Sequence, residues 1–211
     1  MRASMSEELE DSMRKTIVKS KYHDAFLELG EVAYDSFLNE GVLKQIPILK
    51  QLLAIGQLYG NVRDYLLVKK LKLFFDEFSS LSESEREGLI DKLDTDSNYK
   101  LKIGEMVIQA LSSFDDSEKS VFMAKAFKLY SAGQLTYEEL LRVNHALGRF
   151  LLFDLDNLKV FCSSSETALT ENIPAHANFI NAGLAYVASG YGVGGVHPND
   201  TAHAFLRVAN S

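Results

Sequence analysis

The chain has no tryptophan, one cysteine and only three prolines among its 211 residues. A single cysteine, Cys162, excludes an intramolecular disulfide framework and is typical of a protein of the reducing cytoplasm. So few prolines leave long stretches in which a helix is not interrupted. No run of 18 apolar residues occurs, so we expect no ordinary membrane-spanning helix, and the amino-terminal residues lack the apolar core of a secretory signal.

Basic residues are also fewer than acidic ones. The chain carries 22 Lys and Arg against 29 Asp and Glu, which gives a net charge of −7. Nonspecific nucleic-acid binding needs a broad cationic face, so this balance argues against that class while leaving room for a local basic patch. Hydrophobic residues make up 46% of the chain, which is ordinary for a globular protein with a buried core.

Helical periodicity is what the sequence has in abundance. Two helices show clear start signals, because Ser82 with Glu85 and Thr136 with Glu139 have the spacing of a capping box. Pro47 suits the first turn of another helix. The apolar spacing predicts one or two helices over residues 6–40 and single helices over 46–59, 61–78, 80–93, 100–112, 117–131 and 137–150, with a short one over 153–161.

The carboxyl-terminal residues have a different pattern. A helix over 175–183 precedes a β-prone segment, the run GYGVGG at 190–195, a return strand that begins at Val196 and His197, and a helix over 201–209 capped by Asp200. The glycine run lacks the Lys-Ser/Thr of a phosphate-binding loop and the following unit of a dinucleotide fold, so it predicts a hairpin turn. This piece resembles the wing and closing helix of a winged-helix domain.

These patterns predict an all-α protein, a multi-helix bundle with a small carboxyl-terminal helix/β-hairpin/helix piece. We expect a helical domain at 1–161, a serine-rich linker at 162–174 and the carboxyl-terminal piece at 175–211.

One acidic segment has the spacing of a calcium loop. Within 94–105, the oxygen-bearing residues fall at positions 1, 3, 5 and 12 of an EF-hand. Tyr99 stands where that loop needs glycine, and Lys102 places a cation at position 9. An acidic interhelical loop is therefore favoured over a metal site, and we expect no metal or cofactor. The candidate ligands would be Asp94, Asp96, Asn98 and Glu105.

Other candidate chemistry is sparse. His176, His197, Asp200 and His203 match no standard metal signature and are interpreted as core or solvated side chains. The chain has no G-x-S-x-G elbow, no H-E-x-x-H motif and no Cys–His pair in a known local pattern. We therefore expect no enzymatic activity.

The segment 46–59 is apolar almost all round, and a small basic cluster follows it. One hypothesis places this helix in the core, and the alternative places it against a membrane surface, with the lysines on anionic headgroups. Either way, these are the candidate contact residues for a partner or a membrane: Ile48, Leu52, Ile55, Tyr59, Lys69, Lys70 and Lys72.

Several motifs together resemble a group of small bacterial helical proteins. These are an IP-plus-apolar helix, then RDxLxxKK, KxGE and DDxEK helices, then a GL segment with a hairpin, over residues 46–150 and 178–209. No established activity belongs to the group, so no catalytic residue carries over. The resemblance implies a bacterial source and suggests a setting such as phage defence.

The leading hypothesis is a non-enzymatic interaction protein of the bacterial cytoplasm, a sensor or adaptor in phage defence or stress response. Its expected partner is another protein or a second copy of the chain, with no small-molecule substrate evident. Two alternatives stay open: a membrane-active effector using helix 46–59, peripheral at the inner membrane face, and a DNA-binding regulator using the carboxyl-terminal wing.

Overall fold

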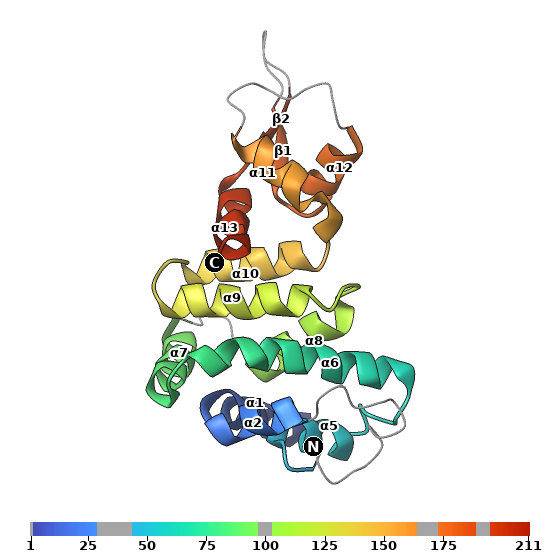
Figure 1. Ribbon diagram of the computed structural model, residues 1–211, viewed down its shortest axis with the longest axis vertical. Helices are drawn as coiled ribbons and strands as arrows, with labels where there is room; N and C mark the ends of the chain where they lie inside the picture. The colour runs from blue at the N-terminus through green and yellow to red at the C-terminus, as the bar shows by residue number, and fades with distance from the viewer. Residues whose placement is uncertain (1, 29–43, 97–102, 164–172, 189–194) are drawn as a thin grey trace. The chain divides into compact units, whose positions relative to one another are not determined.

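The computed structural model describes residues 2–28, 44–96, 103–163, 173–188 and 195–211 (Figure 1). Helices dominate these residues, and their only sheet is a two-stranded antiparallel hairpin near the carboxyl terminus. The predicted all-α fold with a small hairpin is therefore confirmed. The chain divides into two compact units, unit 1 at Met1–Ala124 and unit 2 at Lys125–Ser211.

Unit 1 is built from helices alone in its described residues. The first helix, α1, contacts α5, α7 and α8, while α6 contacts both α2 and α8. In chain order the elements are α1 (Arg2–Val18), α2 (Ser20–Glu28), α5 (Pro47–Ala54), α6 (Val62–Asp76), the 3-10 turn η1 (Glu77–Ser80), α7 (Glu83–Asp96) and α8 (Ile103–Ser113); α9 (Lys119–Ser131) spans the point where the units divide.

The core of unit 1 is rich in phenylalanine. Phe26 on α2 stacks on Phe75 of α6 with ring centroids 5.0 Å apart, and Phe74 meets Phe78 edge-on at 5.1 Å. All four rings are fully buried. Such aromatic pairs contribute beyond the area they bury, so they fix the position of α6, which carries much of the site described below.

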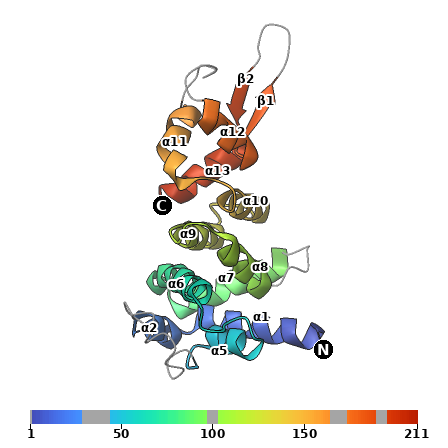
Figure 2. The same ribbon diagram turned by 90° about the vertical axis from the view of Figure 1, so that its right-hand side faces the viewer.

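Unit 2 places the hairpin on a small helical layer. Strand β1 contacts α12 and β2 contacts α13 (Figure 2). Phe150 lies at the centre of its core, 5.0 Å from the ring of Phe205 and 6.2 Å from that of Phe179. Its elements after α9 are α10 (Tyr137–Leu147), η2 (Leu152–Asp154), α11 (Leu155–Ser163), α12 (Ile173–Asn181), β1 (Ala185–Ala188), β2 (Gly195–Pro198) and α13 (Asp200–Ala209).

Helix starts follow the local signals well. The capping boxes at Ser82 with Glu85 and at Thr136 with Glu139 both form. The cap of the last helix differs from the prediction, because it is Asn199 rather than Asp200. The Asn199 side chain accepts the backbone N–H of Ala202 at 3.1 Å. Asp200 is instead the first helical residue, where its charge suits the positive end of the helix.

The predicted helix 46–59 is shorter in the structure. It begins at Pro47 as expected but ends at Ala54. Gly56 and Gly60 have φ of +68° and +82°, a left-handed conformation that glycine adopts without steric cost. The apolar periodicity continues past residue 54, but the backbone turns there to lead into α6.

Some predicted features lie partly or wholly outside the described residues. The strands on either side of the glycine run pair antiparallel, with Tyr186 opposite His197 and Ala188 opposite Gly195, whereas 189–194 are not described. Residues 29–43, 97–102 and 164–172 are also not described. The predicted linker at 162–174 and the domain limits drawn from it stay predictions.

Candidate functional site

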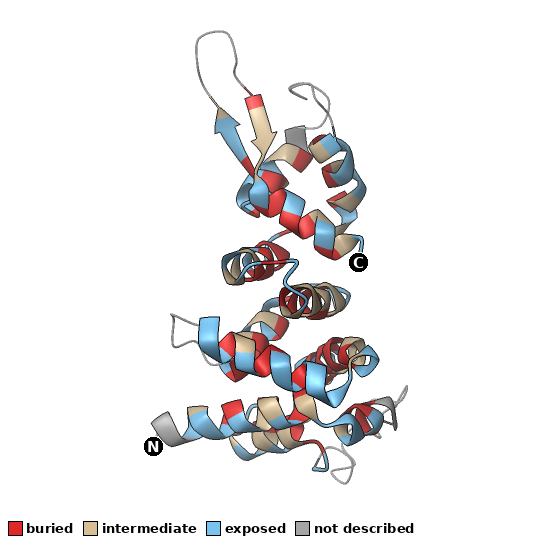
Figure 3. Ribbon diagram, turned by 90° about the vertical axis from the view of Figure 1, so that its left-hand side faces the viewer, coloured by how far each residue is buried: buried red, intermediate tan, exposed pale blue. Residues whose placement is uncertain are grey.

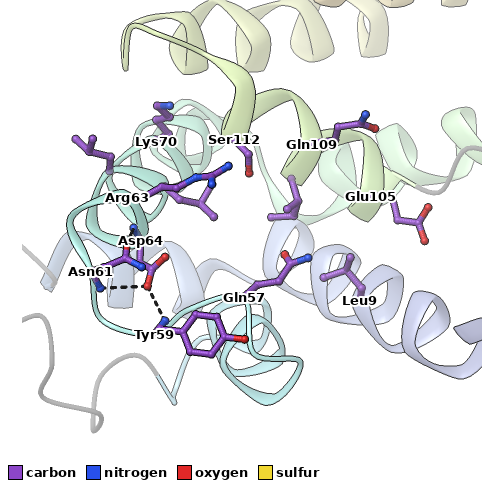
Figure 4. Close-up of a pocket in the computed structure, with 13 residues that line it drawn as sticks. Leu9, Gln57, Tyr59, Asn61, Arg63, Asp64, Lys70, Glu105, Gln109 and Ser112 are labelled. Carbon is purple, nitrogen blue, oxygen red and sulfur yellow. Dashed lines mark hydrogen bonds between the residues drawn. The ribbon is translucent and has the colours of Figure 1, made fainter. Parts of the chain in front are cut away.

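A pocket of about 660 Å³ opens in unit 1 between α6, α8 and the turn that joins α5 to α6 (Figure 4). Its volume lies within the range of about 300–1,000 Å³ that is usual for ligand pockets. Leu9 of α1, Leu67 of α6 and Ile108 of α8 are buried and supply its apolar floor.

A single carboxylate holds the turn beside the pocket. Oδ2 of Asp64 accepts the backbone N–H groups of Tyr59, Gly60 and Asn61 at 2.5, 2.8 and 3.2 Å. In return, Oδ1 of Asn61 accepts the N–H of Asp64 at 3.0 Å, which completes a capping box at the start of α6. Asp64 is buried, so its three hydrogen bonds are shielded from water and hold the backbone of the turn that carries Tyr59.

The rim of the pocket exposes large apolar side chains. Tyr59 is 80% exposed, and Leu66, one of the lining residues, is 42% exposed. Val62 stands between them in sequence and is 63% exposed. Val62 and Leu66 are four residues apart on α6 and so lie on one side of that helix, while Tyr59 stands in the turn before it. Together they form what we call the apolar rim: Tyr59, Val62 and Leu66.

Two cations of α6 line the pocket. Nζ of Lys70, a residue only 8% exposed, donates to the carbonyl oxygens of Leu111, at 3.1 Å, and Phe114, at the carboxyl end of α8. Arg63 lies two helical turns before it and extends across the pocket toward Ser112 (Figure 4). Burial is the main cause that lowers the pKa of Lys70, and the nearby charge of Arg63 adds to it.

The rest of the wall is polar. Among the described residues, the side chains of Gln57, Gln109 and Ser112 have no protein hydrogen-bond partner, although all three line the pocket. Glu105, at the same wall, accepts a hydrogen bond from the hydroxyl of Ser6. The arrangement thus offers an apolar floor, unused hydrogen-bonding groups and positive charge in one place.

The sequence-predicted contact residues separate in the structure. Ile48 and Leu52 are fully buried in the core of unit 1, and Ile55 is half-buried. Figure 3 shows how buried and exposed positions alternate along the helices. Of these apolar candidates only Tyr59 reaches the pocket. Ile48 and Leu52 are therefore not available to a membrane in this conformation, and no helix among the described residues is long and apolar enough to cross a bilayer.

The three lysines do not form the expected basic cluster. Lys69 is exposed, Lys70 is buried against α8, and Nζ of Lys72 pairs with Oδ2 of Asp76 at 2.7 Å. The reason is helical geometry, because adjacent residues of a helix point about 100° apart. Lys70 falls on the buried face with Leu67 and therefore turns away from the solvent-facing Lys69.

The calcium-loop candidates are not assembled into one site by the described residues. Both oxygens of Asp94 accept hydrogen bonds from Arg14, which lowers the pKa of that carboxyl group. Asp96 is the exposed last residue of α7, Glu105 faces the pocket, and Asn98 lies outside the described part of the chain. No group of three His, Cys, Asp or Glu residues in the described ranges is placed to hold a metal ion.

Two histidines of unit 2 pack against aromatic rings. The ring of His197 stacks on that of Tyr186 across the hairpin, with centroids 5.6 Å apart, and His176 lies 5.2 Å from Phe161. His203 is exposed on α13.

Sequence reasoning did not single out Arg63, Gln109 or the Asn61–Asp64 capping box. The box had a local signal, because Asn followed three residues later by an acid before an apolar run marks a helix start. Comparison with known proteins adds no further site residue: no family model, no curated protein and no solved structure matches this chain.

Proposed function

We propose that this protein is a binding module that docks a segment of a partner protein in the pocket of unit 1. The apolar rim carries the proposal, since Tyr59 and Leu66 line the pocket while staying exposed, and the exposed Val62 stands between them in sequence. Adjacent exposed apolar residues around a concave site are typical of interaction surfaces, and tyrosine is enriched at their centres.

The turn that carries Tyr59 supports this function further. Its backbone is held by Asp64 and does not depend on a ligand for its shape. A rigid binding surface loses less conformational freedom when a partner binds, which favours affinity. A role as a sensor or adaptor in the bacterial cytoplasm, in phage defence or stress response, would need such a module and is part of the proposal.

The test compares proteins retained from an extract of the producing cells. The rim variant Tyr59→Ser/Leu66→Ser is compared with the wild type and with Phe153→Ser, which removes a 90% exposed phenylalanine from unit 2. We expect the wild type and Phe153→Ser to retain the same partner and the rim variant to lose it, with all three giving the same circular dichroism and urea midpoint. Equal retention by all three proteins would overturn the proposal.

The partner can also be a second copy of the chain. In that case sedimentation would show a dimer for the wild type and for Phe153→Ser, and a monomer for the rim variant. Flotation with anionic liposomes addresses the membrane alternative separately, because binding that persists in the rim variant would place the membrane contact elsewhere.

A further inference from the structure

We infer that the partner segment presents a carboxylate beside an apolar side chain, and that the carboxylate binds Arg63 while the apolar side chain enters the pocket. This inference rests on the proposed function and specifies the chemistry of its ligand.

Arg63 is the first reason. Its guanidinium lines the pocket, and within the described part of the chain it has no ion pair and no hydrogen bond to a protein acceptor. A guanidinium carries five N–H donors in a planar fork that matches the two oxygens of a carboxylate. The N–H donors of the Arg63 guanidinium are therefore available to a peptide carboxylate.

Lys70 is the second reason. Its ammonium uses two of its three N–H donors on the carbonyl groups of α8 and has no carboxylate within ion-pair distance among the described residues. The charges of Asp115 and Asp116 partly offset the effect of Arg63 on it, although Asp115 itself pairs with Lys119 at 2.5 Å. Arg63 and Lys70 are thus like charges facing one pocket, and an anion between them and the solvent would relieve their repulsion.

The two acidic residues that line the pocket are engaged by other groups of the protein and not by Arg63. The carboxylate of Asp64 is occupied by three backbone N–H groups of the turn, and that of Glu105 accepts the Ser6 hydroxyl. Neither carboxylate lies within ion-pair distance of Arg63 among the described residues, so the donors of this guanidinium stay available to an acceptor from outside the chain.

The neutral part of the wall favours a peptide over a purely apolar acid. Gln57, Gln109 and Ser112 offer donors and acceptors that no described protein group uses. A peptide backbone has an N–H and a C=O at each residue and can satisfy such groups, whereas a hydrocarbon chain cannot. Leu67 and Ile108 at the floor then accept one apolar side chain.

The experiment titrates ¹⁵N-labelled protein with two matched peptides and follows amide resonances by NMR. One peptide is acetyl-Gly-Glu-Phe-Leu-Gly-amide, and the other has Gln in place of Glu. We expect the Glu peptide to bind the wild type about tenfold more tightly, because a hydrogen bond to a charged acceptor contributes more than one to a neutral acceptor. The shifted resonances should be those of the turn at 56–61 and of α8.

Two variants assign that preference to Arg63. Arg63→Gln should bind both peptides equally, while Lys69→Gln, which removes one exposed positive charge of the same helix outside the pocket, should keep the preference. Unchanged dispersion of the NMR spectrum establishes that both variants are folded.

Each other outcome counts against the inference. Equal binding of the two peptides by the wild type, no binding of either, or a preference that survives in Arg63→Gln would overturn it, while the docking proposal would still be judged by the rim variant. Tighter binding of 4-phenylbutyrate than of the Glu peptide would overturn the inference that the ligand is a peptide and would identify a small carboxylic acid as the ligand.

Discussion

Nη2 of Arg207 lies 2.6 Å from Oε1 of Glu139, while Oε2 of the same carboxylate accepts the backbone N–H of Thr136 at 2.8 Å. One side chain therefore caps α10 and ties it to α13. The N–H of Thr136 is the largest cause of the lowered pKa of Glu139, and the hydrogen bond from Arg207 also lowers it.

The two roles of Glu139 can be separated by substitution. Glu139→Gln keeps an acceptor for the cap but removes the ion pair, and should lower the free energy of unfolding by less than about 1 kcal/mol. Glu139→Ala removes both and should cost about 1–2 kcal/mol. Urea unfolding measures the difference, with Glu138→Ala as the control: it breaks only an exposed ion pair with Arg142 and should cost less than about 0.5 kcal/mol. If Gln costs as much as Ala, the ion pair rather than the cap is the main contribution.

Gly104 marks a close crossing of α1 and α8. A Cβ at this position would lie 3.1 Å from the carbonyl oxygen of Leu9 and 3.2 Å from Cα of Glu10, both backbone atoms. Gly104→Ala should therefore destabilise the protein by about 1–3 kcal/mol. Gly88→Ala on α7, with no atom within 4 Å of the added Cβ, should stabilise it by about 0.5–1 kcal/mol. Thermal unfolding compares the two, and a neutral Gly104→Ala would show that the helices separate at little cost.

Lys70 has a structural role besides its place in the pocket. Lys70→Met keeps the length of the side chain but leaves the carbonyl groups of Leu111 and Phe114 without their donor. We expect a loss of about 1–3 kcal/mol in the free energy of unfolding. Lys69→Met on the exposed face should stay within about 0.5 kcal/mol of the wild type. A Lys70→Met protein as stable as Lys69→Met would mean that those carbonyl groups find other donors.

His23 predicts a pH dependence of stability. Its ring nitrogens lie 3.0 Å from the carbonyl oxygen of Phe75 and 2.9 Å from that of Ile17, and a neutral imidazole can donate to only one of them. Burial, with a smaller effect from the charge of Arg86, lowers the pKa of His23 below its ordinary value of 6.5. The unfolded chain therefore binds this proton more readily than the folded protein.

The direction of the pH dependence follows from this difference in pKa between the folded and unfolded states. The contribution of His23 to stability is fully present above pH 6.5 and is lost as the pH falls through the lowered pKa of the folded state. The free energy of unfolding should thus fall more steeply from pH 7 to pH 5 for the wild type than for His23→Gln, which carries no titrating group. Equal slopes in urea titrations at these pH values would contradict the prediction.

Local signals account for the parts of the fold that the sequence predicted well. The capping boxes at Ser82 and Thr136 depend only on residues three apart, so they form as expected. The end of α5 was missed because the apolar pattern continues through residue 59, whereas the positive φ of Gly56 decides where the helix ends. Asn199 and Asp200 are both good caps, and the sequence does not choose between them.

The site was harder to predict because it depends on distant segments. Arg63 becomes a pocket residue only where α6 packs on α8, and no short-range pattern reports that contact. The burial of Lys70 had a usable signal, because Leu67 and Phe74 lie three and four residues away on the same helical face. The prediction grouped Lys69, Lys70 and Lys72 because they are close in sequence. In the structure they lie on different faces of α6.

The hydrogen bond from the N–H of Gly104 to Oε2 of Glu10 joins residues 94 positions apart. The first helix leaves the ribosome long before α8 exists, and at about 5–20 residues per second the delay is roughly 5–20 s. Met13 and Ile17 on this helix end fully buried, and α1 packs on α5 and α7 as well as α8, so its packing is complete only after all three have been synthesised. The apolar face of α1 is therefore covered completely only late in the synthesis of unit 1, and the rate of translation sets how long that takes.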